Sequence, residues 1–250
     1  MIPFYVPNLG AFLKNSSGNI LFLILIAVAL FATLGYAVTQ SMRSGGNNTT
    51  QETSTINAAV LSQYTASLRS AIQRMTTDNH DIRTLEFNRT EDFATLTSPD
   101  VGVFHPSGGA VIYQNAPFAL LDTQSGNSTG KWVFTMNFEV KDIGTDSASS
   151  LDGNDLIAFM VGVRKEVCEQ LDKKLAIPTN PIPKITSLTY SSDMITNINT
   201  YDMDNNYVSP TSESVIGAGA DDAALAGKSE GCYYEATDNT YVYYGVISER

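Results

Sequence analysis

The sequence predicts an α+β protein in which a single N-terminal transmembrane helix precedes an antiparallel sheet packed on two amphipathic helices. Three observations predict this fold class. An uncharged, almost wholly apolar run covers residues 19–39. Apolar residues recur every three or four positions over 53–75 and again over 155–175, and they alternate with polar residues over 131–140.

The run at 19–39 has the length of a membrane span. Nineteen residues, 20–38, rise about 28 Å as a helix, close to the hydrocarbon thickness of about 30 Å. A helix buried in a globular domain would carry a polar face, which this run lacks. A cleaved secretory signal is the alternative, but its apolar core would be about 7 to 15 residues long. We therefore expect a retained anchor, with the lipid bilayer as a partner.

The flanks of the run suggest how the rest of the chain is arranged. Residues 1–18 contain helix-breaking Pro3 and Pro7 and are expected to be a leader or a short cytoplasmic tail. Residues 40–52 are rich in Gly, Ser and Asn and predict a linker. Basic residues are scarce on both sides of the run, so the large polar segment 53–250 decides the orientation. We expect that segment to be an exported α+β domain.

Composition narrows the possible functions. The chain has 250 residues, only 15 Lys and Arg and a formal charge of −11, which is not the electrostatic pattern of a nucleic-acid binder. Its only cysteines, Cys168 and Cys232, have no metal-ligand or redox spacing. In an oxidising compartment they would form one disulfide. Two free buried thiols are the alternative.

Gly18, followed directly by Asn19 and the long apolar helix, resembles the class III signal of type IV pilins and type II secretion pseudopilins. The resemblance covers about the first 75 residues. It departs from the family pattern at Leu23, where most members carry glutamate. It implies cleavage after Gly18, a mature chain that starts at Asn19, and packing of the helix with other pilin-like subunits.

By this resemblance the chain would be a structural subunit of a bacterial envelope assembly. It would cross the inner membrane once and hold its C-terminal domain in the periplasm or outside the cell. A single-pass binding or sensor domain that does not polymerise is the alternative function.

Two amphipathic helices are expected in the exported domain. The first, over 53–75, would bury one stripe of apolar side chains (Ile56, Val60, Tyr64, Leu68, Ile72 and Met75). The second, over 155–175, would bury another (Leu156, Met160, Val163, Val167, Leu171 and Leu175) and end before Pro178.

The strands are expected to form an antiparallel sheet with one face on the helices and the other toward solvent. The clearest strand is 131–140, with five apolar side chains on one face (Trp132, Phe134, Met136, Phe138 and Val140). Weaker strands are predicted at 84–87, 101–104, 110–113 and 184–190. Segments 231–235 and 240–248 predict a C-terminal hairpin rich in tyrosine, which suits either sheet packing or a contact surface.

One acidic loop partly matches a calcium site. Asp202, Asp204, Asn206 and Glu213 occupy positions one, three, five and twelve of a calcium-binding loop. Position six, where the tight turn requires glycine, is Tyr207. An ordinary solvated acidic loop is therefore the alternative to calcium as a cofactor.

No catalytic motif is present. The only histidines, His80 and His105, lie in predicted loops, and no nucleophile and base share a productive spacing. Sequence signatures of nucleotide-binding loops, serine hydrolases and zinc proteases are missing. We expect neither an enzyme nor a small-molecule substrate.

Overall fold

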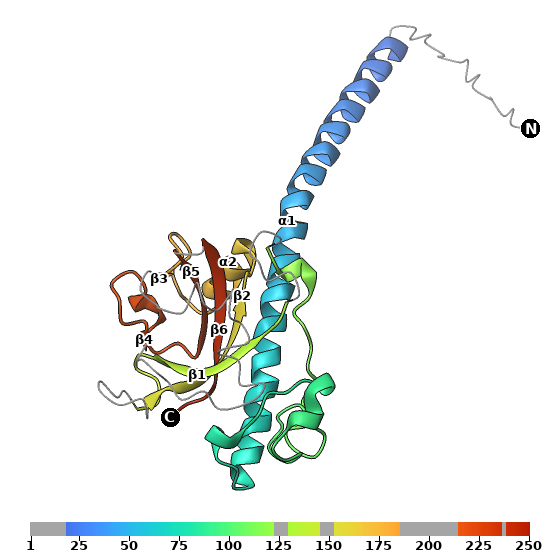
Figure 1. Ribbon diagram of the computed structural model, residues 1–250. Helices are drawn as coiled ribbons and strands as arrows, with labels where there is room; N and C mark the ends of the chain where they lie inside the picture. The colour runs from blue at the N-terminus through green and yellow to red at the C-terminus, as the bar shows by residue number, and fades with distance from the viewer. Residues whose placement is uncertain (1–18, 123–129, 146–152, 186–214, 237–238) are drawn as a thin grey trace, which may run out of the picture. The chain divides into compact units, whose positions relative to one another are not determined.

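The computed structural model describes residues 19–122, 130–145, 153–185, 215–236 and 239–250. Within the first of these ranges, the side chains of 19–21, 23 and 34–49 are outside the description. The chain divides into two compact units, Met1–Thr50 and Gln51–Arg250. The second unit is a mixed α+β domain with a six-stranded sheet (Figure 1).

Helix α1 runs from Asn19 to Thr77, a length of 59 residues. The linker expected over 40–52 is helical instead, although it contains Gly45 and Gly46. Each glycine costs about 1 kcal/mol in a helix, but helix growth is cooperative and long helical segments flank the pair on both sides. In the described part of the chain no helix is long and apolar enough to cross a membrane. The transmembrane helix over 19–39 stays a prediction.

The C-terminal part of α1 buries a stripe that differs from the predicted one. Leu68, Ile72 and Met75 are buried as expected. Toward the N-terminus of the domain, Leu61 and Ala58 are buried, whereas Ile56 and Val60 are 63% and 37% exposed. The buried face there is lined by small and polar residues such as Ser54, Asn57 and Thr65. The prediction followed hydrophobicity alone and therefore selected the wrong face of these turns.

The sheet has the strand order β3-β5-β6-β2-β1-β4. Its strands are β1 (Val133–Val140), β2 (Asp155–Val161), β3 (Lys184–Ile185), β4 (Val215–Ile216), β5 (Glu230–Glu235) and β6 (Thr240–Ser248). The four central strands β5, β6, β2 and β1 pair antiparallel, which confirms the predicted sheet at its centre. The short edge strands β3 and β4 pair parallel to their neighbours, so the sheet as a whole is mixed.

Strand β1 confirms the predicted strand but not its simple alternation. Thr135 pairs with Ile157, whereas Phe138 pairs with Asp155, so β1 carries one extra residue between these pairs. Such a bulge moves every later side chain to the opposite face. Phe134 and Met136 therefore belong to the core beneath the helices, while Phe138 and Val140 belong to the core on the other face.

Polar side chains from β2 and the residue before it stabilise this bulge. The Asp155 carboxylate accepts hydrogen bonds from Val140 N and Arg250 N, at 3.0 and 3.3 Å. The Asn154 amide donates to the carbonyl of Met136 at 3.0 Å. Side chains thus replace ladder bonds that the extra residue interrupts.

The helix predicted over 155–175 is wrong in its first half. Residues 155–161 form strand β2, which is buried along its whole length. A run buried on both faces has no period-two signal, so Leu156 and Met160 also fitted a helical stripe. Gly162, at a φ of 82°, ends the strand, and helix α2 covers only Lys165–Lys174. Val167 and Leu171 are buried beneath the sheet, as predicted for the second half.

The weaker strands predicted at 84–87, 101–104 and 110–113 are wrong. The structure has one isolated bridge there, between Glu86 and Gly102, with short 3₁₀ turns around it. The apolar residues of these segments are used for packing, because the Phe87 ring stacks on Phe134 at 4.5 Å between centroids. Of the strand expected at 184–190, β3 covers the first two residues, and 186–190 lie outside the described residues.

Two hydrophobic cores lie on opposite faces of the sheet. One contains the buried stripes of α1 and α2 together with Phe134, Met160 and Tyr243. The other contains Phe159, Tyr233 and Val246, covered by residues such as Ile177 and Leu225. The expectation that one face meets solvent is wrong, and β1 is accordingly buried at all eight positions.

Candidate functional site

The predicted disulfide is present. Cys168 of α2 and Cys232 of β5 are bonded, with Cα atoms 5.3 Å apart and a sequence separation of 64. Both residues are completely buried. The bond joins α2 to the C-terminal hairpin that the sequence predicted, in which Glu230–Glu235 of β5 pairs with the first six residues of β6, Thr240 to Gly245.

A buried carboxyl group lies beside this disulfide. Asp172 is one helical turn beyond Cys168, and its Oδ1 accepts a hydrogen bond from Cys232 N at 2.9 Å. Its Oδ2 is buried without a hydrogen-bond partner among the described residues. Burial, opposed in part by the Cys232 hydrogen bond, raises the pKa of Asp172 to about 7. The sequence placed Asp172 outside the apolar stripe and gave no sign of this burial.

Polar groups also hold α1 against β6. The hydroxyls of Thr65 and Tyr243 are 2.8 Å apart, and Tyr243 donates to Glu230 Oε2 at 3.1 Å. Arg69 donates through Nε to the carbonyl of Val246 at 3.1 Å. Burial raises the pKa of Tyr243 well above its ordinary value, so this hydroxyl stays a proton donor. These contacts fix the position of the helix along the strand.

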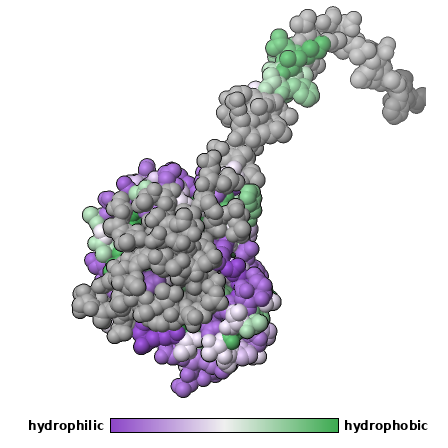
Figure 2. All heavy atoms as spheres, viewed as in Figure 1, coloured by the Kyte–Doolittle hydropathy of each residue, from purple (hydrophilic) through white to green (hydrophobic). Residues whose placement is uncertain are grey.

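Unit Met1–Thr50 presents the apolar surface of α1. Seven large hydrophobic side chains are exposed on it: Phe22, Ile24, Leu25, Ile26, Val28, Leu30 and Phe31. They give this stretch of helix its green surface in Figure 2. Exposures of 62% at Leu25 and 76% at Phe31 are unusual for residues of this type.

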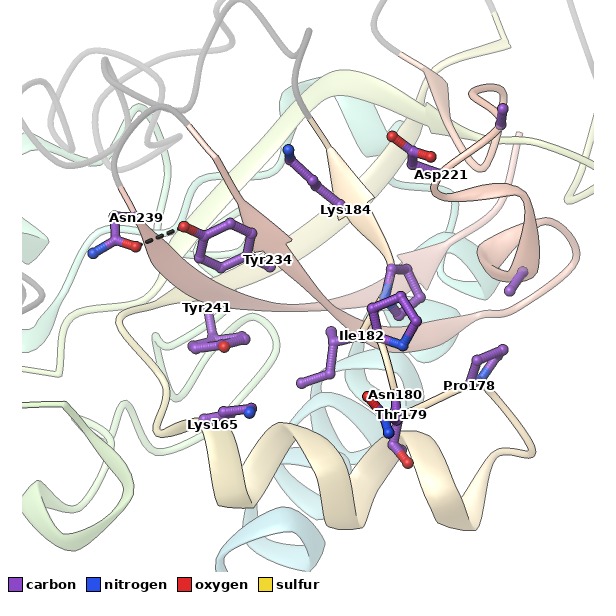
Figure 3. Close-up of a pocket in the computed structure, with 14 residues that line it drawn as sticks. Lys165, Pro178, Thr179, Asn180, Ile182, Lys184, Asp221, Tyr234, Asn239 and Tyr241 are labelled. Atoms are coloured by element: carbon purple, nitrogen blue, oxygen red, sulfur yellow. Dashed lines mark hydrogen bonds between the residues drawn. The ribbon is translucent and has the colours of Figure 1, made fainter.

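A pocket of about 720 Å³ lies against the β5–β6 hairpin (Figure 3). Four stretches that are distant in sequence surround it: the start of α2 at Lys165, residues 178–184, residues 220–224 and the hairpin itself. Tyr234 and Tyr241 are a cross-strand pair on the hairpin, with ring centroids 5.3 Å apart. The Tyr234 hydroxyl donates to Asn239 Oδ1 at 2.6 Å, which fixes that ring.

Charges of both signs surround the pocket. Lys165 forms an ion pair with Glu169 of the same helix at 3.4 Å. Lys184 is exposed, and its backbone N–H donates to the carbonyl of Asp221 at 3.1 Å. Partial burial raises the pKa of Tyr241, an effect that Lys165 opposes. The lining therefore offers ammonium, carboxylate, amide and phenol groups around two aromatic rings.

The tyrosines of the hairpin serve both of the purposes considered from sequence. Tyr233, Tyr243 and Tyr244 are fully buried and pack in the two cores. Tyr234 and Tyr241 are half-buried and line the pocket. The sequence indicated a tyrosine-rich contact surface here, but it gave no signal for the partners 165, 178–184 and 220–224.

The remaining predicted site residues lie mostly outside the part of the chain that the structure describes. Asp202, Asp204, Asn206 and Glu213 lie outside the described residues, as does Gly18. Asn19 is the first residue of α1, and its side chain is not described. Within the described ranges no group of three His, Cys, Asp or Glu side chains is placed to hold a metal ion. Calcium binding and cleavage after Gly18 stay predictions.

Comparison of the chain with protein-family models, with curated proteins and with solved structures found no match.

Proposed function

We propose that the chain is a structural, pilin-like or pseudopilin-like subunit of a bacterial envelope assembly, held in the inner membrane by its N-terminal helix. The observation that carries this proposal is that the two ends of α1 have different surroundings. One unbroken helix from Asn19 to Thr77 exposes large apolar side chains between Phe22 and Phe31 and buries Leu61, Leu68 and Ile72 in the core of a domain.

The apolar stretch supports an anchor because water does not stabilise such a surface. Nothing between Asn19 and Thr39 carries a charge, and the stretch has the length of a bilayer span. Lipid tails and the matching helices of other subunits are the two environments in which these side chains lose their contact with water. A pilin-like subunit uses both.

The C-terminal domain supports a structural role. Its hairpin is linked to α2 by the Cys168–Cys232 disulfide and to α1 by the Thr65–Tyr243 hydrogen bond. A domain exported to an oxidising compartment forms and retains such a disulfide. Both connections resist separation of the last strands from the helices.

A charge in the apolar stretch tests the anchor. Leu25→Asp should make the free energy of membrane insertion less favourable by about 3 kcal/mol. The protein should therefore be lost from the carbonate-resistant membrane fraction. Gln63→Asp places the same charge at an exposed position of α1 in the second unit and should fractionate like the parent. Full membrane retention of Leu25→Asp at normal yield would exclude this stretch as the anchor.

Assembly is tested by cross-linking in native membranes. Val28 is 63% exposed, and Val28→Cys should give disulfide-linked dimers on oxidation if helices of several subunits pack together. Val28→Ser measures any background from the native cysteines. The alternative, a single-pass binding domain that does not polymerise, gains support from the pocket on the hairpin. That alternative predicts equal, negligible cross-linking of the two variants.

A further inference from the structure

We propose that the pocket between the β5–β6 hairpin and the start of α2 binds a neutral saccharide. The inference concerns a site separate from the anchor and does not rest on the proposed function. The pocket, at about 720 Å³, falls in the range of about 300 to 1,000 Å³ that small-molecule sites occupy.

Two half-buried aromatic rings give the pocket an apolar wall. Tyr234 and Tyr241 lie next to each other with an interplanar angle of 53°, and Figure 3 shows both beside the central space, with Ile182 and Lys184 across from them. A sugar ring has an apolar face of C–H groups, which an aromatic face covers well, and a rim of hydroxyls that needs polar partners. The hydrogen bond to Asn239 holds the Tyr234 ring in place before a ligand arrives.

Polar side chains line the pocket around the two rings and can bind the hydroxyl groups of a sugar. Asn180, Lys184 and Asp221 line the pocket and are exposed, and none of the three side chains has a hydrogen-bond partner within the described ranges. Together they offer both donors and acceptors, and a hydroxyl needs both.

The charge around the pocket favours a neutral ligand over an anion. The ammonium of Lys165 is already paired with Glu169, and Asp221 stands on the same rim as Lys184. Glu166 adds a further carboxylate near Tyr241. The three nearby carboxylates of Glu166, Glu169 and Asp221 outnumber the two lysines of the lining, so no excess positive charge is available for a phosphate or a carboxylate.

The backbone around the pocket offers few free hydrogen-bonding groups, which argues against a peptide ligand that adds a strand. Three prolines of the lining, Pro178, Pro181 and Pro183, have no N–H group. The N–H groups of Tyr234 and Lys184 already donate to the carbonyls of Pro183 and Asp221. Recognition of an extended peptide by strand addition needs a row of free N–H and C=O groups. Side-chain recognition of a saccharide does not.

The test is a titration of the full chain, purified in a zwitterionic detergent without a sugar headgroup. Ligand-observed NMR would follow three neutral probes, tri-N-acetylchitotriose, cellotriose and maltotriose, and one anionic probe, trigalacturonic acid. At least one neutral trimer should bind saturably and more tightly than the acid. Tyr241→Ala should weaken that binding about tenfold, because it removes one stacking face. Tyr241→Phe, which keeps the ring, should stay within about threefold of the parent.

Phe118→Ala provides the matched control. Phe118 is an exposed aromatic residue outside the pocket, and its loss should leave the titration unchanged. If Tyr241→Ala fails to fold, Lys184→Ala takes its place, because an exposed side chain is removed while the backbone pairing of β3 is retained. That variant should also bind more weakly. No saturable binding of any neutral trimer, tighter binding of the acid, or binding indifferent to these pocket variants would overturn the proposal.

Discussion

Gly245 of β6 lies so close to Thr65 of α1 that a Cβ atom on the glycine would come within 2.9 Å of Thr65 Cγ2. The same Cβ would be 2.8 Å from the Tyr243 hydroxyl, which already bonds to Thr65. The helix can approach the strand at this point because residue 245 has no side chain. Gly245→Ala should therefore lower the free energy of unfolding by about 1 to 3 kcal/mol through overpacking.

Denaturant unfolding of the full chain in detergent measures this effect. Thr65→Ser keeps the hydroxyl and removes Cγ2, so it provides the matched partner variant. In the Thr65→Ser background, Gly245→Ala should cost less than in the parent, since one of its clashes is gone. An equal cost in both backgrounds would show that the helix does not depend on this close approach.

Asp172 should make stability depend on pH. Its folded pKa of about 7 lies above the ordinary value of 3.8, so between these values the folded state binds more protons than the unfolded state. Its contribution is therefore fully present at low pH and is lost as the pH rises to about 7, by at most about 1.4 kcal/mol per pH unit. Above that pH the carboxylate is buried and charged.

Asp172→Asn separates this effect from other titrations. The amide oxygen can still accept the Cys232 N–H, while the charge is gone. The stability of the variant relative to the parent should rise by about 2 to 4 kcal/mol between pH 4 and pH 8. Guanidinium unfolding at several pH values measures the difference, and a difference that is constant with pH would contradict a raised pKa.

The disulfide should contribute substantially to stability. Cys168 and Cys232 are 64 residues apart in sequence. Without the bond, the unfolded chain gains conformational entropy, so the free energy of unfolding should fall by about 2 to 4 kcal/mol. The double variant Cys168→Ala, Cys232→Ala should show this loss in denaturant unfolding. Non-reducing digestion and mass spectrometry of the native protein should find the linked peptides. Two free thiols in that digest would contradict both the bond and an oxidising location.

The sequence predicted those features whose signals are local. The hairpin, strand β1, the pairing of two lone cysteines and the buried residues in the second half of the helix predicted over 53–75 follow from alternation, composition and periodicity. The bulge in β1 could not be predicted in this way. It depends on hydrogen bonds that the Asp155 carboxylate accepts from the N–H groups of Val140 and Arg250, and Arg250 is 95 positions away in sequence.

The second helix shows why buried strands were missed. Residues 156–161 are apolar on both faces of the strand, and only the short segment 162–164, which begins with Gly162 at a positive φ, separates it from the helix that follows. The candidate pocket could not be predicted from the sequence, because its residues are distant along the chain. Tyr241 belongs to the predicted tyrosine-rich hairpin, but Lys165, Lys184 and Asp221 come near it only in the folded domain.

The position of the mature N-terminus tests most directly whether the chain is a pilin-like subunit. The protein would be extracted from the membranes of a bacterial host with its own prepilin peptidase, and its intact mass and N-terminal sequence determined. The proposal predicts a chain that starts at Asn19, with the residues up to Gly18 removed. Gly18→Val should block the cut and keep the leader. A parent chain that still begins at Met1 would contradict the pilin-like proposal. So would a chain that is cut at another position and whose cleavage Gly18→Val does not affect.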